Sequence, residues 1–289
     1  MISIIFLGTG GGAPSKYRKL PAVFVRVEGV GILLDAGEGV QERLSEASIS
    51  PMDIDVLAIS HMHGDHVLGV TGLLETMGLL GRKKELVIIG PRTIQDFIES
   101  SSSGTFFKPQ FDIRFQSSLE TKEFSITPFP TCHTIESQGY IIRTRDKIKI
   151  DINKAKELGI SDWNLFRKIK TGYHADISPS TVEYITYKIK GISIAYTGDT
   201  RYCSEVLQNV KGVNLLIHDS TFLDEETAAE FGHSTSRDAA KAALNASVGM
   251  LALIHISSRY HDTTPLLTEA KRIFPRTILP EDLSKLVFK

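Results

Sequence analysis

Three histidines and an aspartate gather in one short stretch of this 289-residue chain. His61, His63, Asp65 and His66 follow directly after the apolar run at 56–59, which has the composition of a buried strand. On an irregular loop, alternate side chains can converge, and a helix that begins near His66 would aim that side chain at the same place. Imidazole nitrogens and carboxylate oxygens suit zinc, with iron or manganese as alternatives. A single tetrahedral ion would not use all of these ligands together with others from elsewhere, so the motif predicts more than one metal ion.

A glycine-rich turn at 8–13 matches the G-x-G-x-x-A pattern of dinucleotide-binding sites, and Asp35 lies about as far downstream as a ribose ligand would. In such sites the turn opens a helix whose first residues bind the pyrophosphate. Here a basic segment bracketed by Pro14 and Pro21 follows, without an acidic residue until Glu28. The pattern therefore favours a loop whose backbone approaches another group, next to a basic stretch that suits a polyanion.

Short apolar runs and segments of helical spacing predict an α/β chain in which strands come first and then alternate with helices. The runs that predict strands are Ile2–Leu7, Ala22–Val27, Ile32–Leu34, Val56–Ile59, Leu86–Ile89, Phe111–Phe115, Phe124–Thr127, Tyr140–Arg143, Ile192–Tyr196, Leu215–Ile217 and Leu251–His255. The segments with helical spacing are Val67–Leu80, Thr93–Ser100, Ser204–Asn209 and Ser236–Ala246. A loop is expected at 101–105, where the sequence is Ser-Ser-Ser-Gly-Thr.

The charges are balanced overall but not along the chain. Lys and Arg number 33 against 34 Asp and Glu, which argues against a strongly basic nucleic-acid binder. The segment 143–190 nevertheless carries eleven basic residues against six acidic ones, which leaves the remainder of the chain at −6. A basic, helix-rich insertion in an acidic body indicates a surface for a partner, and a solvated face is the alternative.

Cys132 and Cys203 are the two cysteines of the chain, and neither belongs to a C-x-x-C pair. Two cysteines cannot build a disulfide framework, so a reducing, cytoplasmic location is expected. The first basic residue is Lys16, and the apolar run at the N-terminus is too short to span a membrane. We therefore expect a strand there, and no association with a membrane.

The H-x-H-x-D-H motif is the signature of the metallo-β-lactamase superfamily, which this sequence resembles over nearly its full length. The remaining superfamily motifs match Asp35, His133, Asp199 and His255, each at the end of a predicted strand. The resemblance implies an α/β fold of αββα type, with two mixed β-sheets flanked by helices. It also implies a single domain over residues 1–289, interrupted by an arm-like insertion at about 143–190.

Within the superfamily the sequence resembles the ribonuclease Z family. The segment 14–19 resembles that family's P-x-K-x-R-N loop, with Lys19 in place of Asn. The segment 218–222 resembles its H-E-A-T motif, with Asp219 for Glu and Ser220 for Ala, and 233–235 matches its H-S-T motif. The basic insertion falls between the third and fourth motifs, where the family carries an arm that grips the tRNA elbow.

The ribonuclease Z resemblance implies a homodimeric, zinc-dependent endoribonuclease that removes the 3′ trailer from precursor tRNA, leaving a 3′-hydroxyl on the tRNA and a 5′-phosphate on the trailer. It implies two zinc ions per subunit, one held by His61, His63 and His133, the other by Asp65, His66 and His255, with Asp199 bridging them. Asp65 would act as the base, His233 as the general acid, Asp35 as an orienting residue and His218 as a structural one. The basic residues expected to contact RNA are Lys16, Arg18, Lys19, Lys154, Lys156, Lys168 and Lys170.

Several alternatives remain at this point. A hydrolase of the same fold acting on a thioester, lactone, sulfate ester or cyclic phosphodiester would share the metals but has no use for a basic insertion. A di-iron protein that reduces oxygen or NO usually carries an added flavin domain, and a non-catalytic RNA-binding relative would not need every ligand. His233 also precedes a predicted helix, so a role beside the helix N-cap competes with the catalytic one. We expect His174 and His261 at the surface.

Overall fold

The computed structural model describes residues 1–172 and 177–288, so His174 lies outside the described residues. The chain forms two compact units. The larger unit comprises Met1–Arg143 and Ser193–Lys289, and the smaller unit comprises Thr144–Ile192. Apolar cores belong to both units, and each unit is described by itself below.

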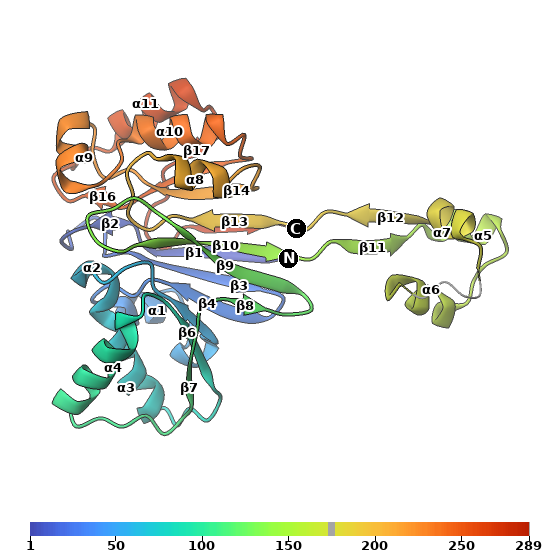
Figure 1. Ribbon diagram of the computed structural model, residues 1–289, viewed down its shortest axis with the longest axis horizontal. Helices are drawn as coiled ribbons and strands as arrows, with labels where there is room; N and C mark the ends of the chain where they lie inside the picture. The colour runs from blue at the N-terminus through green and yellow to red at the C-terminus, as the bar shows by residue number, and fades with distance from the viewer. Residues whose placement is uncertain (173–176, 289) are drawn as a thin grey trace. The chain divides into compact units, whose positions relative to one another are not determined.

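Two seven-stranded sheets, counted over the described residues, form the centre of the larger unit (Figure 1). The first sheet has the order β18 (Lys285–Phe288), β1 (Ile2–Gly8), β3 (Ala22–Val27), β4 (Val30–Leu34), β5 (Val56–Ala58), β6 (Leu86–Ile89) and β7 (Ile113–Gln116). The second has the order β17 (Thr277–Ile278), β15 (Leu251–Ile254), β14 (Leu215–Asp219), β13 (Ser193–Tyr196), β10 (Gln138–Thr144), β9 (Phe124–Pro130) and β8 (Leu119–Glu120). Both sheets are mixed, since β1 and β3 are antiparallel whereas β4 and β5, and β13 and β14, are parallel.

Helices cover the outer face of each sheet, so the larger unit is layered as helices, sheet, sheet and helices (Figure 1). The helices on the first sheet are α1 (Val40–Glu46), α2 (Gly64–Val67), α3 (Gly69–Leu79) and α4 (Thr93–Gly104), with the 3-10 helix η1 (Pro51–Asp53). The helices on the second are α8 (Ser204–Asn209), α9 (Glu225–Phe231), α10 (Ser236–Asn245) and α11 (Thr264–Ile273). This architecture confirms the predicted αββα class.

The ends of the parallel strands position the chemistry. Asp35 follows β4, and His61 lies three residues beyond the end of β5. In the second sheet Asp199 follows β13, Asp219 ends β14 and His255 follows β15. Because the carboxyl ends of neighbouring parallel strands lie at the same edge of a sheet, these five positions are brought to one edge of each sheet.

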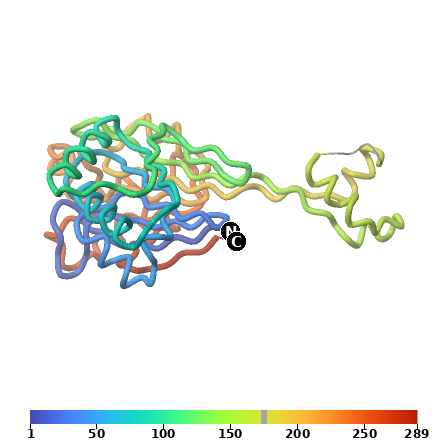
Figure 2. The backbone as a smooth tube through the Cα atoms, turned by 90° about the horizontal axis from the view of Figure 1, so that it is seen from below, coloured from blue at the N-terminus to red at the C-terminus, as the bar shows by residue number. Residues whose placement is uncertain are grey.

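The larger unit differs from the sequence prediction at α4, at its C-terminal elements, and at α1 and α9, which were not predicted. The prediction of a loop at 101–105 is wrong for residues 101–104, because α4 continues through Gly104. The Ser101 hydroxyl donates to the Ile98 carbonyl and accepts a hydrogen bond from Thr71, so it is satisfied without ending the helix. The C-terminal elements α11, β17 and β18 were not predicted. Strand β18 pairs with β1 and places Phe288 opposite Ile2, so the two terminal strands lie side by side (Figure 2).

The described residues of the smaller unit form a strand pair and three helices. The antiparallel strands are β11 (Lys147–Ile150) and β12 (Thr186–Ile189), and the helices are α5 (Ile152–Glu157), α6 (Trp163–Lys170) and α7 (Pro179–Ile185). Side chains of Asp151, Asp162 and Ser178 cap the three helix N-termini. The sequence predicted the helices here but not the strand pair, whose lysines alternate with isoleucines. Among the described residues of the chain, no helix has the length and apolar character to cross a membrane.

Candidate metal centre

The histidine motif occupies the turn between β5 and α2. The helix α2 begins at Gly64, two residues earlier than predicted, with His63 as its N-cap. His61 and His66 are fully buried, whereas His63 is partly exposed. The turn thus presents its side chains from an extended segment and from the first turn of a helix.

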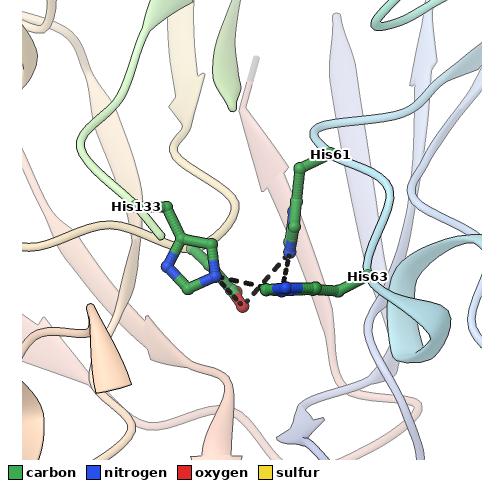
Figure 3. Close-up of side chains that lie close together, drawn as sticks. His61, His63 and His133 are labelled. Carbon is green, nitrogen blue, oxygen red and sulfur yellow. Dashed lines mark hydrogen bonds and ion pairs between the residues drawn. The ribbon is translucent and has the colours of Figure 1, made fainter. Parts of the chain in front are cut away.

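One cluster of ligand atoms joins this turn to the loop after β9. The Nδ1 atom of His63 lies 3.1 Å from Nε2 of His61 and 3.1 Å from Nε2 of His133. Figure 3 shows the three rings turned toward one another. Asp199 Oδ2 lies 3.5 Å from Nε2 of His61 and 3.8 Å from Nε2 of His133. Three nitrogens and one oxygen therefore face one point, which suits a divalent metal ion.

A second cluster lies on the other side of the Asp199 carboxylate. Its members are Asp65, His66 and His255, with Oδ2 of Asp65 3.2 Å from Nε2 of His255 and 3.7 Å from Nε2 of His66. The Oδ1 atom of Asp199 lies 3.2 Å from Nε2 of His66 and 3.3 Å from Nε2 of His255. The two oxygens of Asp199 therefore face different clusters, which is the geometry of a bridging carboxylate.

Two buried atoms at this junction are without hydrogen bonds. Nε2 of His66 and Oδ1 of Asp199 are inaccessible to solvent, and neither forms a hydrogen bond among the described residues. Without a metal ion, the 3.2 Å ion pair between them needs a proton on Nε2 of His66, whereas a divalent cation would take the place of that proton and bind both atoms. The residues present thus fit two divalent ions.

Burial and neighbouring charges shift the pKa values of these groups strongly. Burial lowers the pKa of His61 to about 2, and the charge on His66 adds to this effect. For His66, burial works against the charged form, but Asp199 and Asp35 outweigh it and raise the pKa well above its usual value. Burial likewise opposes the charge on Asp199, yet His255 and His66 hold its pKa well below the ordinary range. The site therefore concentrates charge that metal ions would neutralise by displacing protons.

Asp35 orients the histidine motif without facing the ligand clusters. Its Oδ2 atom lies 2.7 Å from Nδ1 of His66, and its Oδ1 atom accepts from the Ser60 amide at 2.6 Å. The Tyr196 hydroxyl, from the second sheet, donates to the same carboxylate at 2.5 Å. Such partners fix the ring orientation of a metal-binding histidine. The sequence predicted the role of Asp35 but not its partner Tyr196.

His233 lies beside both clusters and is oriented by Asp219. Its Nδ1 atom is 2.8 Å from Oδ2 of Asp219. Burial opposes the charged form of His233, but the charge of Asp219 and the hydrogen bond to it raise the pKa to about 9. Asp219 is fully buried and was missed by the sequence analysis as a site residue, although it stands at the Glu position of the H-E-A-T motif. The N-cap of α10 is Thr235, with a capping box to Asp238, so His233 itself does not cap that helix.

The glycine-rich loop reaches the second cluster. The amide of Gly12 donates to Oδ2 of Asp65 at 2.8 Å. At Gly11 a Cβ atom would overlap the ring of His255, so only glycine fits. His255 itself has a positive φ of 60°, in a region that is costly for a residue with a side chain. We expected the backbone of this loop to approach another group. In the structure that group is the set of candidate metal ligands.

Replacing Gly11 by alanine should disturb the second cluster. We expect lower occupancy of one metal ion and a decrease in phosphodiester hydrolysis of about 10- to 100-fold, the usual cost of disturbing groups that support a metal ligand. Metal analysis and a chromogenic diester assay measure both effects. Gly104→Ala is the matched control, because no heavy atom lies within 4 Å of a Cβ at that position. Equal behaviour of the two variants would contradict the packing argument.

The residues predicted to contact RNA fall into two groups. In the larger unit Lys16 is exposed and Lys19 half-buried, whereas Arg18 donates to Thr9 Oγ1 and to the Pro280 carbonyl. Arg18 is thus hydrogen-bonded within the protein, and its contact with RNA stays a prediction. In the smaller unit the predicted lysines are all exposed, on α5 and α6, and they are Lys154, Lys156, Lys168 and Lys170.

Two further sequence expectations concern His218 and the cysteines. His218 is fully buried on β14, and its Nδ1 lies 2.7 Å from the Asp219 carbonyl, in keeping with a structural role. Cys132 and Cys203 form a disulfide, although they are 71 residues apart in sequence. The bridge joins the loop of His133 to the loop of Asp199. Cysteine content therefore no longer argues for a reducing compartment.

Known proteins share this chain's sequence and fold. Residues 31–256 match a family model described as Beta-lactamase superfamily domain. The chain is 51% identical to Ribonuclease Z of Sulfolobus acidocaldarius over 100% of its own length and 99% of that protein's. It is 50% identical to Ribonuclease Z of Saccharolobus islandicus over 100% of both chains. The crystal structure of human tRNase Z, short form, aligns with a TM-score of 0.71 and 25% identity, over 99% of this chain and 98% of that one. The chain belongs to the ribonuclease Z family of endoribonucleases, within the β-lactamase superfamily.

Proposed function

We propose that the protein is a zinc-dependent endoribonuclease that removes the 3′ trailer from precursor tRNA, leaving a 3′-hydroxyl on the tRNA and a 5′-phosphate on the trailer. The observation that carries the proposal is the convergence of two ligand clusters on the opposite oxygens of Asp199. His61, His63 and His133 would hold one ion, and Asp65, His66 and His255 the other. Two bound ions would supply positive charge for the transition state and lower the pKa of a water molecule toward neutrality. Manganese or iron would suit the same ligands.

Asp65 is the residue that we assign to orient the attacking water and accept its proton. Its Oδ2 atom is fixed by the Gly12 amide and by His255. That arrangement leaves Oδ1 to take the proton. The water attacks phosphorus, the bond from phosphorus to the tRNA 3′-oxygen breaks, and the phosphate stays on the trailer.

His233 is the residue that we assign to protonate the leaving 3′-oxygen. Asp219 occupies its Nδ1 atom, so Nε2 remains for the substrate. The ring stacks on His255 at 5.0 Å between centroids, which places it beside the second cluster. A protonated imidazole beside the metal ligands suits a reaction whose leaving group is a poorly stabilised alkoxide.

We infer that RNA binds through the basic insertion, residues 143–190, together with Lys16 and Lys19 of the segment 14–19. The whole chain would then be one catalytic domain carrying an RNA-binding insertion, and the family resemblance further implies a homodimer. A cytoplasmic location follows from the proposed substrate, precursor tRNA. Sedimentation analysis of the purified protein tests the dimer: a monomer at micromolar concentration would contradict it.

Four lysines of the smaller unit give a prediction for substrate binding. Changing Lys154, Lys156, Lys168 and Lys170 together to alanine should raise the KM for precursor tRNA by about tenfold or more, because phosphate contacts dominate such affinities. Each lost contact should also reduce the slope of log affinity against log salt by roughly 0.7–0.9. Cleavage assays and filter binding between about 50 and 200 mM salt measure both quantities.

The control for this variant changes the same number of charges on the larger unit. Lys83, Lys108, Lys122 and Lys211 are all exposed there, and their joint change to alanine should leave KM nearly unaltered. Both variants should hydrolyse bis(p-nitrophenyl) phosphate like the unaltered protein, because the metal ligands are intact. A loss on that small substrate, or an equal rise of KM in the control, would contradict the assignment of the insertion.

Cleavage of precursor tRNA, followed by mapping of both new ends, tests the proposed function directly. The expected result is a single cut near the 3′ end of the tRNA, with a 3′-hydroxyl and a 5′-phosphate, by protein whose metal analysis shows zinc. The competing function is hydrolysis of a small lactone, thioester, sulfate ester or cyclic phosphodiester at the same centre. Turnover of one of these small substrates without RNA cleavage would overturn the proposal and favour the competing function.

A further inference from the structure

One carboxylate closes the base of the glycine-rich loop. Oδ1 of Asp282 accepts from the amide of Thr9 at 3.0 Å and from its hydroxyl at 2.7 Å. Oδ2 of the same side chain accepts from the amide of Lys19 at 2.8 Å. Asp282 belongs to the C-terminal segment between β17 and β18, and its side chain is only 10% exposed. It therefore joins the two ends of a loop that is more than 250 residues away in sequence.

Arg18 secures the same junction from the loop side. Its Nη1 atom donates to Oγ1 of Thr9 at 2.5 Å and to the Pro280 carbonyl at 2.8 Å. The Gly10 amide donates to the Lys19 carbonyl at 2.8 Å, so backbone bonding continues the closure. Polar contacts thus fix the two ends of the loop to the C-terminal segment between β17 and β18, which contains none of the candidate metal ligands.

The closed loop ends on the metal centre. Its Gly12 amide donates to Oδ2 of Asp65, and its Gly11 lies against the ring of His255. The amide of Ile256, next to His255, donates to the carbonyl of Thr9 at 2.9 Å. Asp282 is therefore linked through the loop backbone to Asp65 by the Gly12 hydrogen bond, and to His255 by the packing of Gly11 and the hydrogen bond of the neighbouring Ile256.

We propose that Asp282 is a positioning residue for the phosphodiesterase reaction: it fixes the loop at 9–19 so that the Gly12 amide orients Asp65. The catalytic role of Asp65 in this proposal rests on the proposed function. The hydrogen bonds that hold the loop do not depend on it. Groups that orient metal ligands typically change metal affinity or activity 10- to 100-fold when altered. Glu281, the next residue, is exposed and its side chain forms none of these hydrogen bonds, so Glu281→Gln removes a charge near Arg18 without removing a hydrogen bond of the loop.

The test compares Asp282→Asn with Glu281→Gln. Asparagine keeps one accepting oxygen but turns an N–H group toward the Thr9 or Lys19 donors, so one end of the loop loses its partner. We expect kcat for bis(p-nitrophenyl) phosphate to fall about 10- to 100-fold with little change in KM. The visible absorption of the Co²⁺-loaded protein should change in Asp282→Asn and stay unaltered in Glu281→Gln. That spectrum reports the coordination of the metal, independently of turnover.

Thr9→Val is the second variant, because it removes the hydroxyl shared by Asp282 and Arg18 while keeping the backbone amide. It should reproduce the loss of kcat and the changed cobalt spectrum in a weaker form, even if Asp282→Asn does not fold. Unaltered kcat and an unaltered spectrum in either variant that folds would overturn the proposal, as would the same loss in Glu281→Gln. If the unaltered protein hydrolyses the diester but not precursor tRNA, the proposed function fails while this inference stands.

Discussion

Replacing Asp199 by alanine will reduce phosphodiester hydrolysis by at least about 10³-fold, beyond what loss of one electrostatic contact usually costs. The reason is geometric, because its Oδ2 faces His61 and His133 while its Oδ1 faces His66 and His255. A single substitution therefore removes a ligand from both clusters. Metal analysis of the purified variant should show loss of both ions, and Co²⁺ titration should show weakened binding at two sites.

His63→Ala provides the comparison, since His63 belongs to the first cluster, where its Nδ1 atom faces His61 and His133. Loss of His63 should weaken the binding of one metal ion more than that of the other. Asp112→Ala, an exposed aspartate on the larger unit, controls for the change of charge and should behave like the unaltered protein. If Asp199→Ala kept both ions, or lost no more metal than His63→Ala, Asp199 would not be the bridging ligand.

The sequence predicted the candidate ligands through residue type and spacing at 61–66 and through family resemblance at His133, Asp199 and His255, and the structure brings these side chains into two clusters. Histidines at alternate positions after an apolar strand have few other uses, so His61 and His63 stood out. Tyr196 and Asp219 are different. Tyr196 acts through Asp35, which is 161 residues away in the chain and is brought to it by the packing of the two sheets. Asp219 orients His233, which is 14 residues further along the chain, and its place in the segment that resembles H-E-A-T was the local signal that could have found it.

The same contrast holds for the fold. The buried strand β6 is a continuous apolar run and β3 is interrupted only by Arg26, and the predicted bounds of both agree with the structure. Strands β11, β12 and β18 each contain at least one lysine and leave much of their surface exposed, so they lack that signal. These strands form because another strand pairs with them, and their own apolar content does not predict that pairing. The disulfide between Cys132 and Cys203 is another pairing of this kind.

Changing His233 to alanine should slow cleavage of precursor tRNA by roughly 10²- to 10⁴-fold, the usual contribution of a general acid. The leaving 3′-oxygen of RNA is strongly basic and needs a proton as its bond to phosphorus breaks. The p-nitrophenolate ion is a far weaker base and leaves without one. Hydrolysis of bis(p-nitrophenyl) phosphate should therefore change little in the same variant, and its metal content should be unaltered.

The comparison of the two substrates separates chemistry from structure. A structural role for His233 beside the helix α10 would slow both substrates together, and would lower thermal stability as well. Asp219→Asn should show the same selectivity for RNA in a milder form, because an amide still orients Nδ1 of His233 but no longer supports its charge. His261→Ala, which removes an exposed histidine, is the matched control. If the rates of RNA cleavage and of nitrophenyl diester hydrolysis fell equally, another group would be the proton donor. His233 would then be a packing residue.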